Sequence, residues 1–402
     1  MGSLQSAMNM VELSEEQRLI RRSIRDVCDN FGDEYWRERD KNAEHPTEFV
    51  ETLAEEGWIG ALVPEEYGGP GMSTSEIVVI MEEIGATGGF AAAQSIHGGI
   101  YNIPPILNYG SEEMKSELLP EIAAGETAIQ SLGLTEPNAG SDSTSIETVA
   151  EREGDGYVIN GQKIWISRVD HTDYLILMAR TTPKTEVEKT TDGISMFLLD
   201  VNRVRDSDRF EMKSISKTAA RCVHSYELWF EDVRIPEGNL IGEEGEGFYQ
   251  LLDGLNEERL VIAAECIGLG RSALVTGAEY ADEREVFGRK IGKNQAIQHP
   301  LAEAFADLQA AKQVVYNAAD RIHDISQTDA GIQANMAKYL AAEAAFDAAD
   351  VAVQTHGGFG VAREYDIERY FREARLTRLV PITQELALNY LGTKALGLPQ
   401  SY

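Results

Sequence analysis

Apolar side chains in the first 125 residues recur at helical spacing. Ser14-Glu15-Glu16-Gln17 is a capping-box pattern, and apolar residues follow it three or four positions apart as far as Phe31. A second capping box spans residues 73–76 and begins another such segment. The same spacing predicts helices at 47–56, 90–108 and 112–123, and a Gly- and Pro-rich loop at 58–71. We therefore expect an N-terminal helical domain over residues 11–125.

Short β-prone runs replace this pattern from about residue 126. Asn160-Gly161 lies between two such runs within 157–166, which predicts a tight hairpin at that dipeptide. Further strands are expected at 174–179, 194–200 and 226–230, and a polar loop at 181–192. These segments predict a middle β domain, a barrel or a sandwich, over residues 126–239.

Long Ala-rich segments with a period near 3.6 follow at 251–282, 295–325, 330–356 and 366–396. Their lengths suit a four-helix bundle, which we assign to residues 240–402. The predicted fold is mainly α with a central β domain. Gly268-Leu269-Gly270 and Ala273 match a dinucleotide-binding fingerprint. That fingerprint requires a preceding strand, so we expect these glycines to allow close helix packing instead.

The formal net charge of the 402-residue chain is −31. So negative a surface argues against nucleic acid or an anionic membrane as a partner. Only 12 of the 36 basic residues are Lys. An acidic, Lys-poor surface is one route to solubility in concentrated salt, so we expect a halophilic source.

Three scattered cysteines, Cys28, Cys222 and Cys266, form no CxxC motif. Neither a disulfide framework nor a zinc site is expected, we predict no bound metal, and a reducing cytoplasm fits. No run of eighteen apolar residues occurs, so no membrane insertion is predicted. Residues 1–10 lack the features of a secretory signal and are expected to be a disordered extension.

One stretch between the helical and β patterns, residues 134–142, reads Leu-Thr-Glu-Pro-Asn-Ala-Gly-Ser-Asp and is rich in small and hydroxyl residues. Four more motifs follow it at 163–167, 230–236, 284–288 and 356–360. In this order and spacing the set resembles the acyl-CoA dehydrogenase family, from about Glu12 to the C-terminus.

That resemblance implies FAD-dependent α,β-dehydrogenation of an acyl-CoA to the trans-2-enoyl-CoA. It also implies a homotetramer that passes electrons to an electron-transfer flavoprotein. Two alternatives remain open at this point. One is an oxidase-like enzyme that reduces oxygen directly, and the other is a catalytically silent scaffold on the same fold.

The resemblance implies a set of flavin contacts. Trp165 would form a flat wall beside the ring system, although a core Trp is the alternative interpretation. Arg284, with Gln295, would reach the pyrophosphate of a neighbouring subunit's flavin. His356 is expected to be a helix-end residue. The implied cofactor-binding residues are Leu132, Leu134, Thr135, Gly140, Ser141, Trp165, Ile166, Ser167, Arg284, Phe287, Gln295, Gln354, Gly357, Gly358, Thr383 and Glu385.

The catalytic base requires a separate argument. Many family members carry it in a Tyr-Glu-Gly-Thr segment, but this chain has Pro381 where that Glu would be. Glu258-Arg259-Leu260 instead matches the base position of isovaleryl-CoA and long-chain acyl-CoA dehydrogenases. We therefore predict Glu258 as the base, with an exposed helix acid as the alternative, and Glu385 as base under a shifted alignment. The implied substrate contacts are Ser141, Asn256 and Arg259.

The preceding residue, Glu257, should face another way, because consecutive helical residues diverge by about 100°. A β-domain motif also departs from the family pattern. Ala219 and Val223 stand where relatives have Gly and Ser, whereas Lys217 and Arg221 are retained.

Overall fold

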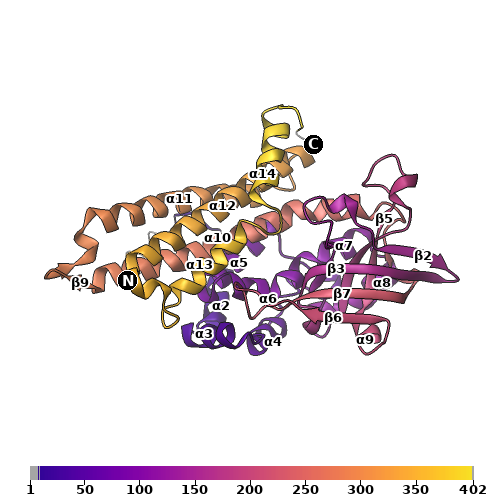
Figure 1. Ribbon diagram of the computed structural model, residues 1–402, viewed down its shortest axis with the longest axis horizontal. Helices are drawn as coiled ribbons and strands as arrows, with labels where there is room; N and C mark the ends of the chain where they lie inside the picture. The colour runs from indigo at the N-terminus through magenta and orange to yellow at the C-terminus, as the bar shows by residue number, and fades with distance from the viewer. Residues whose placement is uncertain (1–7, 9, 401–402) are drawn as a thin grey trace.

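The structure is a computed structural model that describes residue 8 and residues 10–400. Three regions follow one another along the chain (Figure 1). A bundle of long helices occupies one end of the molecule, the β domain occupies the other, and the N-terminal helices lie below the junction between them. This is the predicted order of a helical domain, a β domain and a helical bundle.

The N-terminal region is helical, and both predicted capping boxes are confirmed, at Ser14 and at Ser73. The sequence missed α3, because only Trp36 and Asp40 of that helix are buried and no apolar stripe results. The elements are α2 (Glu15–Cys28), α3 (Asp33–Asn42), α4 (Thr47–Glu55), η1 (Glu65–Tyr67), α5 (Thr74–Gly88), α6 (Phe90–Tyr101), α7 (Ile103–Tyr109) and α8 (Glu112–Ala123).

The single helix predicted at 90–108 is wrong, because the chain forms α6 and α7 with a break at Asn102. Pro104 and Pro105 have no N–H to continue the ladder of α6, although both are tolerated in the first turn of a new helix. The Asn102 amide donates to the backbone oxygen of Ile129 at 2.9 Å and fixes the break.

The middle region is one connected sheet in the order β6-β7-β3-β2-β4-β5-β8, and β1 pairs in parallel with β4. Its strands are β1 (Ser131–Gly133), β2 (Val149–Glu153), β3 (Gly156–Ser167), β4 (Tyr174–Arg180), β5 (Ile194–Asp200), β6 (Phe210–Ser214), β7 (Ser225–Pro236) and β8 (Leu240–Ile241). The shorter elements are η2 (Ser143–Ser145), η3 (Val169–His171), η4 (Lys184–Glu186), α9 (Val201–Val204) and η5 (Glu237–Asn239).

The predicted hairpin at Asn160-Gly161 is wrong. β3 runs straight through that dipeptide, and the turn into it lies at residues 154–155, between β2 and β3. Asn160 instead accepts a hydrogen bond from the amide of Asp232 at 2.9 Å, where the register of β3 against β7 shifts. Long-range pairing with β7 therefore overrides the local turn preference.

The C-terminal region is the bundle of α10 (Gly247–Glu283), α11 (Gln295–Ala319), α12 (Gln327–His356) and α13 (Ile367–Thr377). The helix predicted at 366–396 is interrupted, and α14 (Gln384–Tyr390) projects away from the bundle (Figure 1). Pro381 lies in the break and cannot donate an intrahelical hydrogen bond. The remaining elements are β9 (Glu285–Val286), β10 (Arg289–Lys290), η6 (Ile291–Lys293), η7 (Gly357–Val361) and η8 (Leu391–Ala395).

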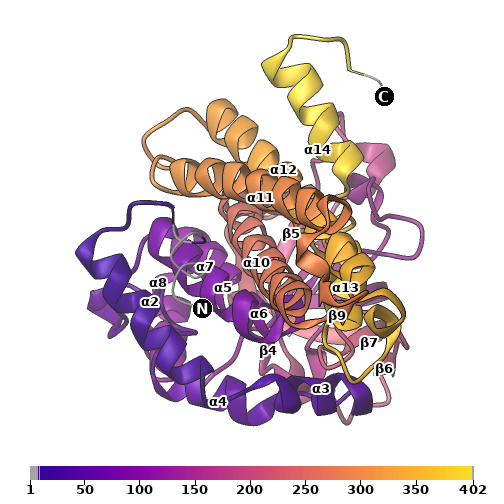
Figure 2. The same cartoon turned by 90° about the vertical axis from the view of Figure 1, so that its left-hand side faces the viewer.

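The central helix α10 contacts both the bundle and the N-terminal region. Figure 2 shows α11 and α12 on one side of it and α5 and α6 on the other. A Cβ atom on Gly268 would lie 2.3 Å from the backbone oxygen of Glu82 in α5. The glycines of the fingerprint-like motif thus serve close helix packing, as predicted. By length and composition alone α10 could span a membrane, but 83% of its most apolar window is buried within the protein, as in the core helix of a bundle.

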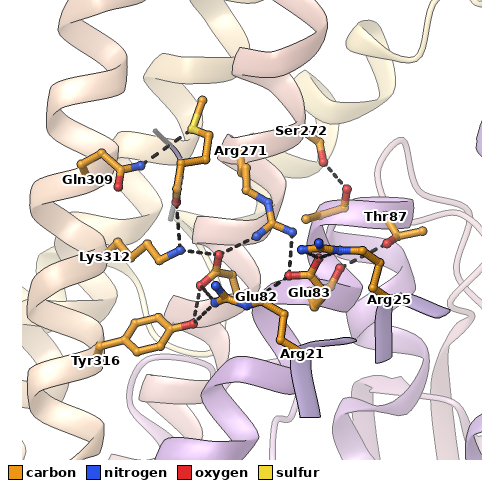
Figure 3. Close-up of polar contacts among 12 residues, drawn as sticks. Arg21, Arg25, Glu82, Glu83, Thr87, Arg271, Ser272, Gln309, Lys312 and Tyr316 are labelled. Atoms are coloured by element: carbon orange, nitrogen blue, oxygen red, sulfur yellow. Dashed lines mark hydrogen bonds and ion pairs between the residues drawn. The ribbon is translucent and has the colours of Figure 1, made fainter. Parts of the chain in front are cut away.

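Figure 3 shows a buried ionic network between these regions. Glu82 of α5 is fully buried and lies 2.7 Å from Lys312 Nζ of α11 and 2.8 Å from Arg271 Nη1 of α10. Burial opposes the charge of this carboxyl, but the surrounding cations hold its pKa below the usual range. The other members are Arg21, Arg25, Glu83 and Tyr316. The network fastens α2 and α5 to the bundle.

Most of the predicted N-terminal extension lies outside the described residues. Met8 is described and is buried, and its backbone oxygen accepts a hydrogen bond from Lys312 at 3.1 Å.

Candidate active site

Glu258 lies on α10, and its side chain is only 8% exposed. The alternative interpretation of this residue as an exposed helix acid is therefore wrong. One of its oxygens lies 3.5 Å from Nε2 of His97, a buried residue of α6. The other ring nitrogen of His97 lies 2.6 Å from Glu265, two turns further along α10. The imidazole thus lies between two carboxylates on one face of α10.

His97 is held rigidly by this arrangement. Burial alone disfavours the imidazolium, but the carboxylates of Glu265 and Glu258 raise the pKa of His97 above its ordinary value. Gln94 donates to the second oxygen of Glu265 at 2.8 Å. The Tyr101 ring lies 4.6 Å from the His97 ring, and burial raises the pKa of the Tyr101 hydroxyl to about 12. The cluster can therefore fix the position of the Glu258 side chain.

Sequence reasoning missed His97, Tyr101 and Glu265. The available signal was periodicity, since His97 and Tyr101 lie four residues apart and Glu258 and Glu265 seven apart, both spacings of a single helical face. Nothing in the sequence indicated that those two faces meet.

Glu257 faces away from this cluster, as its helical angle predicts. Its nearest ion-pair partner is His323 Nδ1 at 3.7 Å, and its side chain is 26% exposed. Burial raises the pKa of Glu257. The two neighbouring acids therefore lie in different surroundings, which makes Glu257 a suitable control for Glu258.

The segment around Pro381 is fixed by Lys338 of α12. The buried ammonium group donates to the backbone oxygen of Ile382 at 2.8 Å and to the Gln384 side chain at 3.1 Å. Burial lowers the pKa of Lys338 to about 8, and the Glu258 carboxylate is among the groups that act against this. Lys338 thus holds the loop that contains Pro381 against α12 and lies within electrostatic reach of Glu258.

Arg259 and Asn256 lie beside Glu258 on α10. Arg259 Nη1 donates to the Asn256 side chain at 2.9 Å. Its Nε is buried and has no hydrogen-bond partner among the residues that the structure describes. Burial lowers the pKa of this guanidinium from its usual value. A buried donor of this kind suits a polar substrate group.

The loop at 134–142 is fastened to β3. Lys163, fully buried, lies 2.7 Å from the Glu136 carboxylate and donates to the backbone oxygen of Leu134 at 3.0 Å. Leu132 and Leu134 pack in the same apolar cluster as Leu255, one turn before Glu258. The loop and the segment of α10 that carries Glu258 therefore border one apolar cluster, whereas Gly140 and Ser141 remain exposed.

Trp165 lies on β3, and its side chain is largely exposed at 55%. The alternative of a core Trp is therefore wrong. Its backbone adopts φ 64° where the register of β3 against β7 shifts between Lys163 and Ile166. A large aromatic held in a left-handed conformation and facing outward suits a stacking wall. Ile166 is buried, so its side chain points away from that wall. Ser167 Oγ lies 3.1 Å from Ser225 Oγ.

The remaining predicted cofactor residues lie elsewhere. Figure 1 shows β9 at the far end of the bundle from β3. Phe287, in the turn after β9, is fully exposed. The other members at that end are exposed too: Arg284, Gln295, Gln354, Gly357 and Gly358.

The last predicted residues lie at the ends of α14 and α12. Thr383 caps α14, and the neighbouring Glu385 is exposed. His356 is the last residue of α12 and stacks on Tyr280 at 4.1 Å, as expected for a helix-end residue. Within one chain, the predicted flavin residues therefore lie in three separate places. These are the 134–142 loop with Trp165, the exposed end of the bundle, and the start of α14.

Comparison with known proteins covers all three regions. The N-terminal, middle and C-terminal domain models of acyl-CoA dehydrogenases match residues 14–126, 131–233 and 245–395. Acyl-CoA dehydrogenase FadE12 of Mycobacterium tuberculosis is 34% identical over 97% of this chain and 98% of its own. The CarC subunit of the caffeyl-CoA reductase–Etf complex of Acetobacterium woodii is 33% identical over 93% and 96%.

Solved structures show the same similarity over nearly the whole chain. Butyryl-CoA dehydrogenase from Megasphaera elsdenii superposes with a TM-score of 0.89 at 29% identity, covering 96% of this chain and 99% of that one. The FAD complex of PigA superposes with a TM-score of 0.88 at 26% identity, covering 96% and 99%.

Proposed function

Because the chain belongs to the acyl-CoA dehydrogenase family and is an oxidoreductase acting on CH–CH bonds, we propose that it converts a saturated acyl-CoA into the trans-2-enoyl-CoA with Glu258 as the base. The observation that carries the proposal is the buried Glu258 carboxylate facing the His97–Glu265 pair. By motif resemblance, Glu258 corresponds to the base position of the isovaleryl-CoA and long-chain types, and Pro381 to the position that carries the base in many other members.

The Glu258 carboxylate removes the α-proton of the thioester. The proton then resides on Glu258 as a carboxylic acid. FAD, when bound, would supply a two-electron acceptor for the β-hydrogen, which leaves with its electron pair. His97 and Glu265 hold the Glu258 carboxylate in place during this step. Since Pro381 has no N–H, the backbone N–H of Ile382 is our candidate donor to the thioester oxygen. Asn256, Arg259 and Ser141 contact the acyl-CoA.

FAD fits the residues present. Trp165 presents an exposed aromatic surface next to the fastened 134–142 loop, so the ring system would lie against these two segments. The Arg284 and Gln354 group lies at the opposite end of the bundle and is exposed, which favours contact with a flavin held mainly by another subunit. This arrangement supports the homotetramer that we propose. We also propose a location in the cytoplasm, where the free cysteines Cys28, Cys222 and Cys266 would stay reduced.

Electrons would pass to an electron-transfer flavoprotein, since the relative CarC is a subunit of a complex with such a protein. The alternatives are direct reduction of oxygen and a silent scaffold. The test is anaerobic titration of the purified protein with acyl-CoA thioesters of different chain length and branching. A flavin spectrum that bleaches, and is reoxidised by electron-transfer flavoprotein faster than by air, supports the proposal. Formation of one peroxide per acyl-CoA oxidised under air would favour the oxidase-like enzyme. Absence of bound flavin after incubation with FAD would favour the catalytically silent scaffold.

A further inference from the structure

Lys217 lies in the loop between β6 and β7, and it is a half-buried cation without a carboxylate partner. Its ammonium group donates to Ser225 Oγ at 2.9 Å, and it forms no ion pair with the residues that the structure describes. Burial lowers the pKa of Lys217 to about 8, and the nearby cation Arg168 acts in the same direction. An ammonium group that is partly removed from water needs further acceptors, so this one suits an electron-rich ligand.

Ser225 connects this ammonium group to β3. It is the first residue of β7 and pairs directly with Ser167, the last residue of β3. The two hydroxyl oxygens lie 3.1 Å apart, and Ser225 is buried. The side chains of Lys217, Ser225 and Ser167 therefore form a continuous hydrogen-bonded chain.

The ammonium end gives this chain a direction. An ammonium group can only donate, whereas a hydroxyl group donates once and accepts twice. Because Lys217 donates to Ser225, its positive charge favours the arrangement in which Ser225 donates its own hydrogen to Ser167. The hydroxyl hydrogen of Ser167 can then be donated to a further group.

Ser167 lies beside the surface against which we propose that the flavin ring system rests. Trp165 is exposed, Ile166 is buried and Ser167 is half-buried, so Trp165 and Ser167 share one side of β3. The amide of Ile164 donates to the backbone oxygen of Thr135 at 2.9 Å. This bond holds the 134–142 loop along the same end of the strand.

Arg168 adds a second positive charge next to Ser167. It is buried, its guanidinium donates to two backbone oxygens, and within the described part of the chain it too forms no ion pair. The carboxylates of Glu265 and Glu373 act on these two cations only at longer range. In a chain with a net charge of −31, two cations without adjoining carboxylates make the end of β3 a locally basic site.

We propose that Lys217 is a positioning residue for FAD, which acts through Ser225 to make Ser167 a hydrogen-bond donor to the flavin and so favours the reduced cofactor. The inference rests on the proposed function, because it takes the ring system to lie beside Trp165. Reduction brings electrons to the flavin, so a nearby positive charge and a directed donor stabilise the reduced form more than the oxidised form. Sequence analysis found Lys217 retained in an altered motif, but only the fold shows its contact with Ser225.

The test measures the midpoint potential of FAD bound to the purified full-length chain, by anaerobic equilibration with a redox dye. K217M should reduce the preference of the site for reduced over oxidised FAD about tenfold, which lowers the two-electron potential by about 30 mV. S225A should lower it in the same direction, and K217R, which keeps a cationic donor, should retain most of the wild-type potential. K213M is the matched control, since Lys213 is exposed on β6, and its potential should equal that of the wild type.

The double variant K217M/S225A tests whether Lys217 acts through Ser225. Its potential should be no lower than that of K217M, because the chain is already interrupted, whereas additive shifts would overturn the proposed route. Circular dichroism and Tm verify folding, and S225A decides the outcome if K217M does not fold. A wild type that takes up no FAD would overturn both this inference and the proposed function. FAD uptake with an unchanged potential in folded K217M, or a loss of acyl-CoA affinity alone, would overturn only this inference.

Discussion

Oε1 of Glu258 and Nε2 of His97 lie 3.5 Å apart, although one belongs to the C-terminal bundle and the other to the N-terminal helices. Glu265 holds the opposite side of the same imidazole at 2.6 Å. The proposed base is therefore positioned across the junction of two regions, and a change in either should affect it.

Replacing Glu258 with Gln keeps its size but removes its capacity to accept a proton. Flavin and substrate should still bind, and the rate of flavin reduction by acyl-CoA, followed by stopped-flow absorbance, should fall at least ~10²-fold. E257Q should change little, because Glu257 faces His323 instead. If E258Q reduces its flavin at the wild-type rate while E385Q is inactive, the base is Glu385 and the alignment at Pro381 is shifted.

The raised pKa of His97 has a consequence for stability. The folded protein binds this proton more tightly than the unfolded chain, whose His has a pKa of about 6.5. The resulting stabilisation is complete below that pH and is lost as the pH rises through the higher folded value. The Tm difference between wild type and H97Q should therefore be larger at pH 6 than at pH 9. Groups facing His97 that could also contribute are Glu258, Glu265 and Tyr101. A difference that is constant or grows with pH would show that His97 is neutral in the folded state.

Arg284 lies exposed at the end of the bundle, where we propose that it contacts a neighbouring subunit's flavin. R284A should release FAD more readily on dilution, measured by the fluorescence of the freed flavin, because a pyrophosphate clamp is lost. R289A is the matched control, since Arg289 lies on the same hairpin and bonds Asn294 instead. Equal FAD retention in both variants would remove Arg284 from the cofactor site.

Local signals in the sequence were sufficient for much of the fold. The Ser14 and Ser73 caps depend on residues three positions apart, so a short window contains the whole interaction. The hairpin predicted at Asn160-Gly161 was wrong because the residue that Asn160 contacts, Asp232, lies 72 residues away in the sequence. The same limit concealed the active-site cluster, in which His97 and Glu265 are 168 residues apart. Motif resemblance indicated Glu258 as the candidate base, which stays a prediction, but it could not supply the groups that hold this side chain.

The net charge of −31 should make the protein depend on salt. Repulsion between like charges destabilises the compact state and is screened as ionic strength rises. We expect the Tm, measured by differential scanning fluorimetry, to rise from dilute buffer to molar KCl, and activity to rise with it. A Tm that stays constant over that range would contradict the expected halophilic source.

The network around Glu82 predicts a large difference between buried and exposed ion pairs. Lys312 and Glu82 are both almost fully buried at 2.7 Å, so K312M leaves a buried carboxylate with one cation fewer. We expect the free energy of unfolding, from urea denaturation, to fall by about 3 kcal/mol, the low end for a broken buried pair, because Arg271 still pairs with Glu82. K290M breaks the exposed Lys290–Asp282 pair at 2.9 Å and should cost less than about 1 kcal/mol. In the double variant E82Q/K312M the carboxylate is gone, so its loss should be smaller than the sum of the two single losses. Additive losses would show that Lys312 contributes through packing alone and that the network has no coupled ionic role.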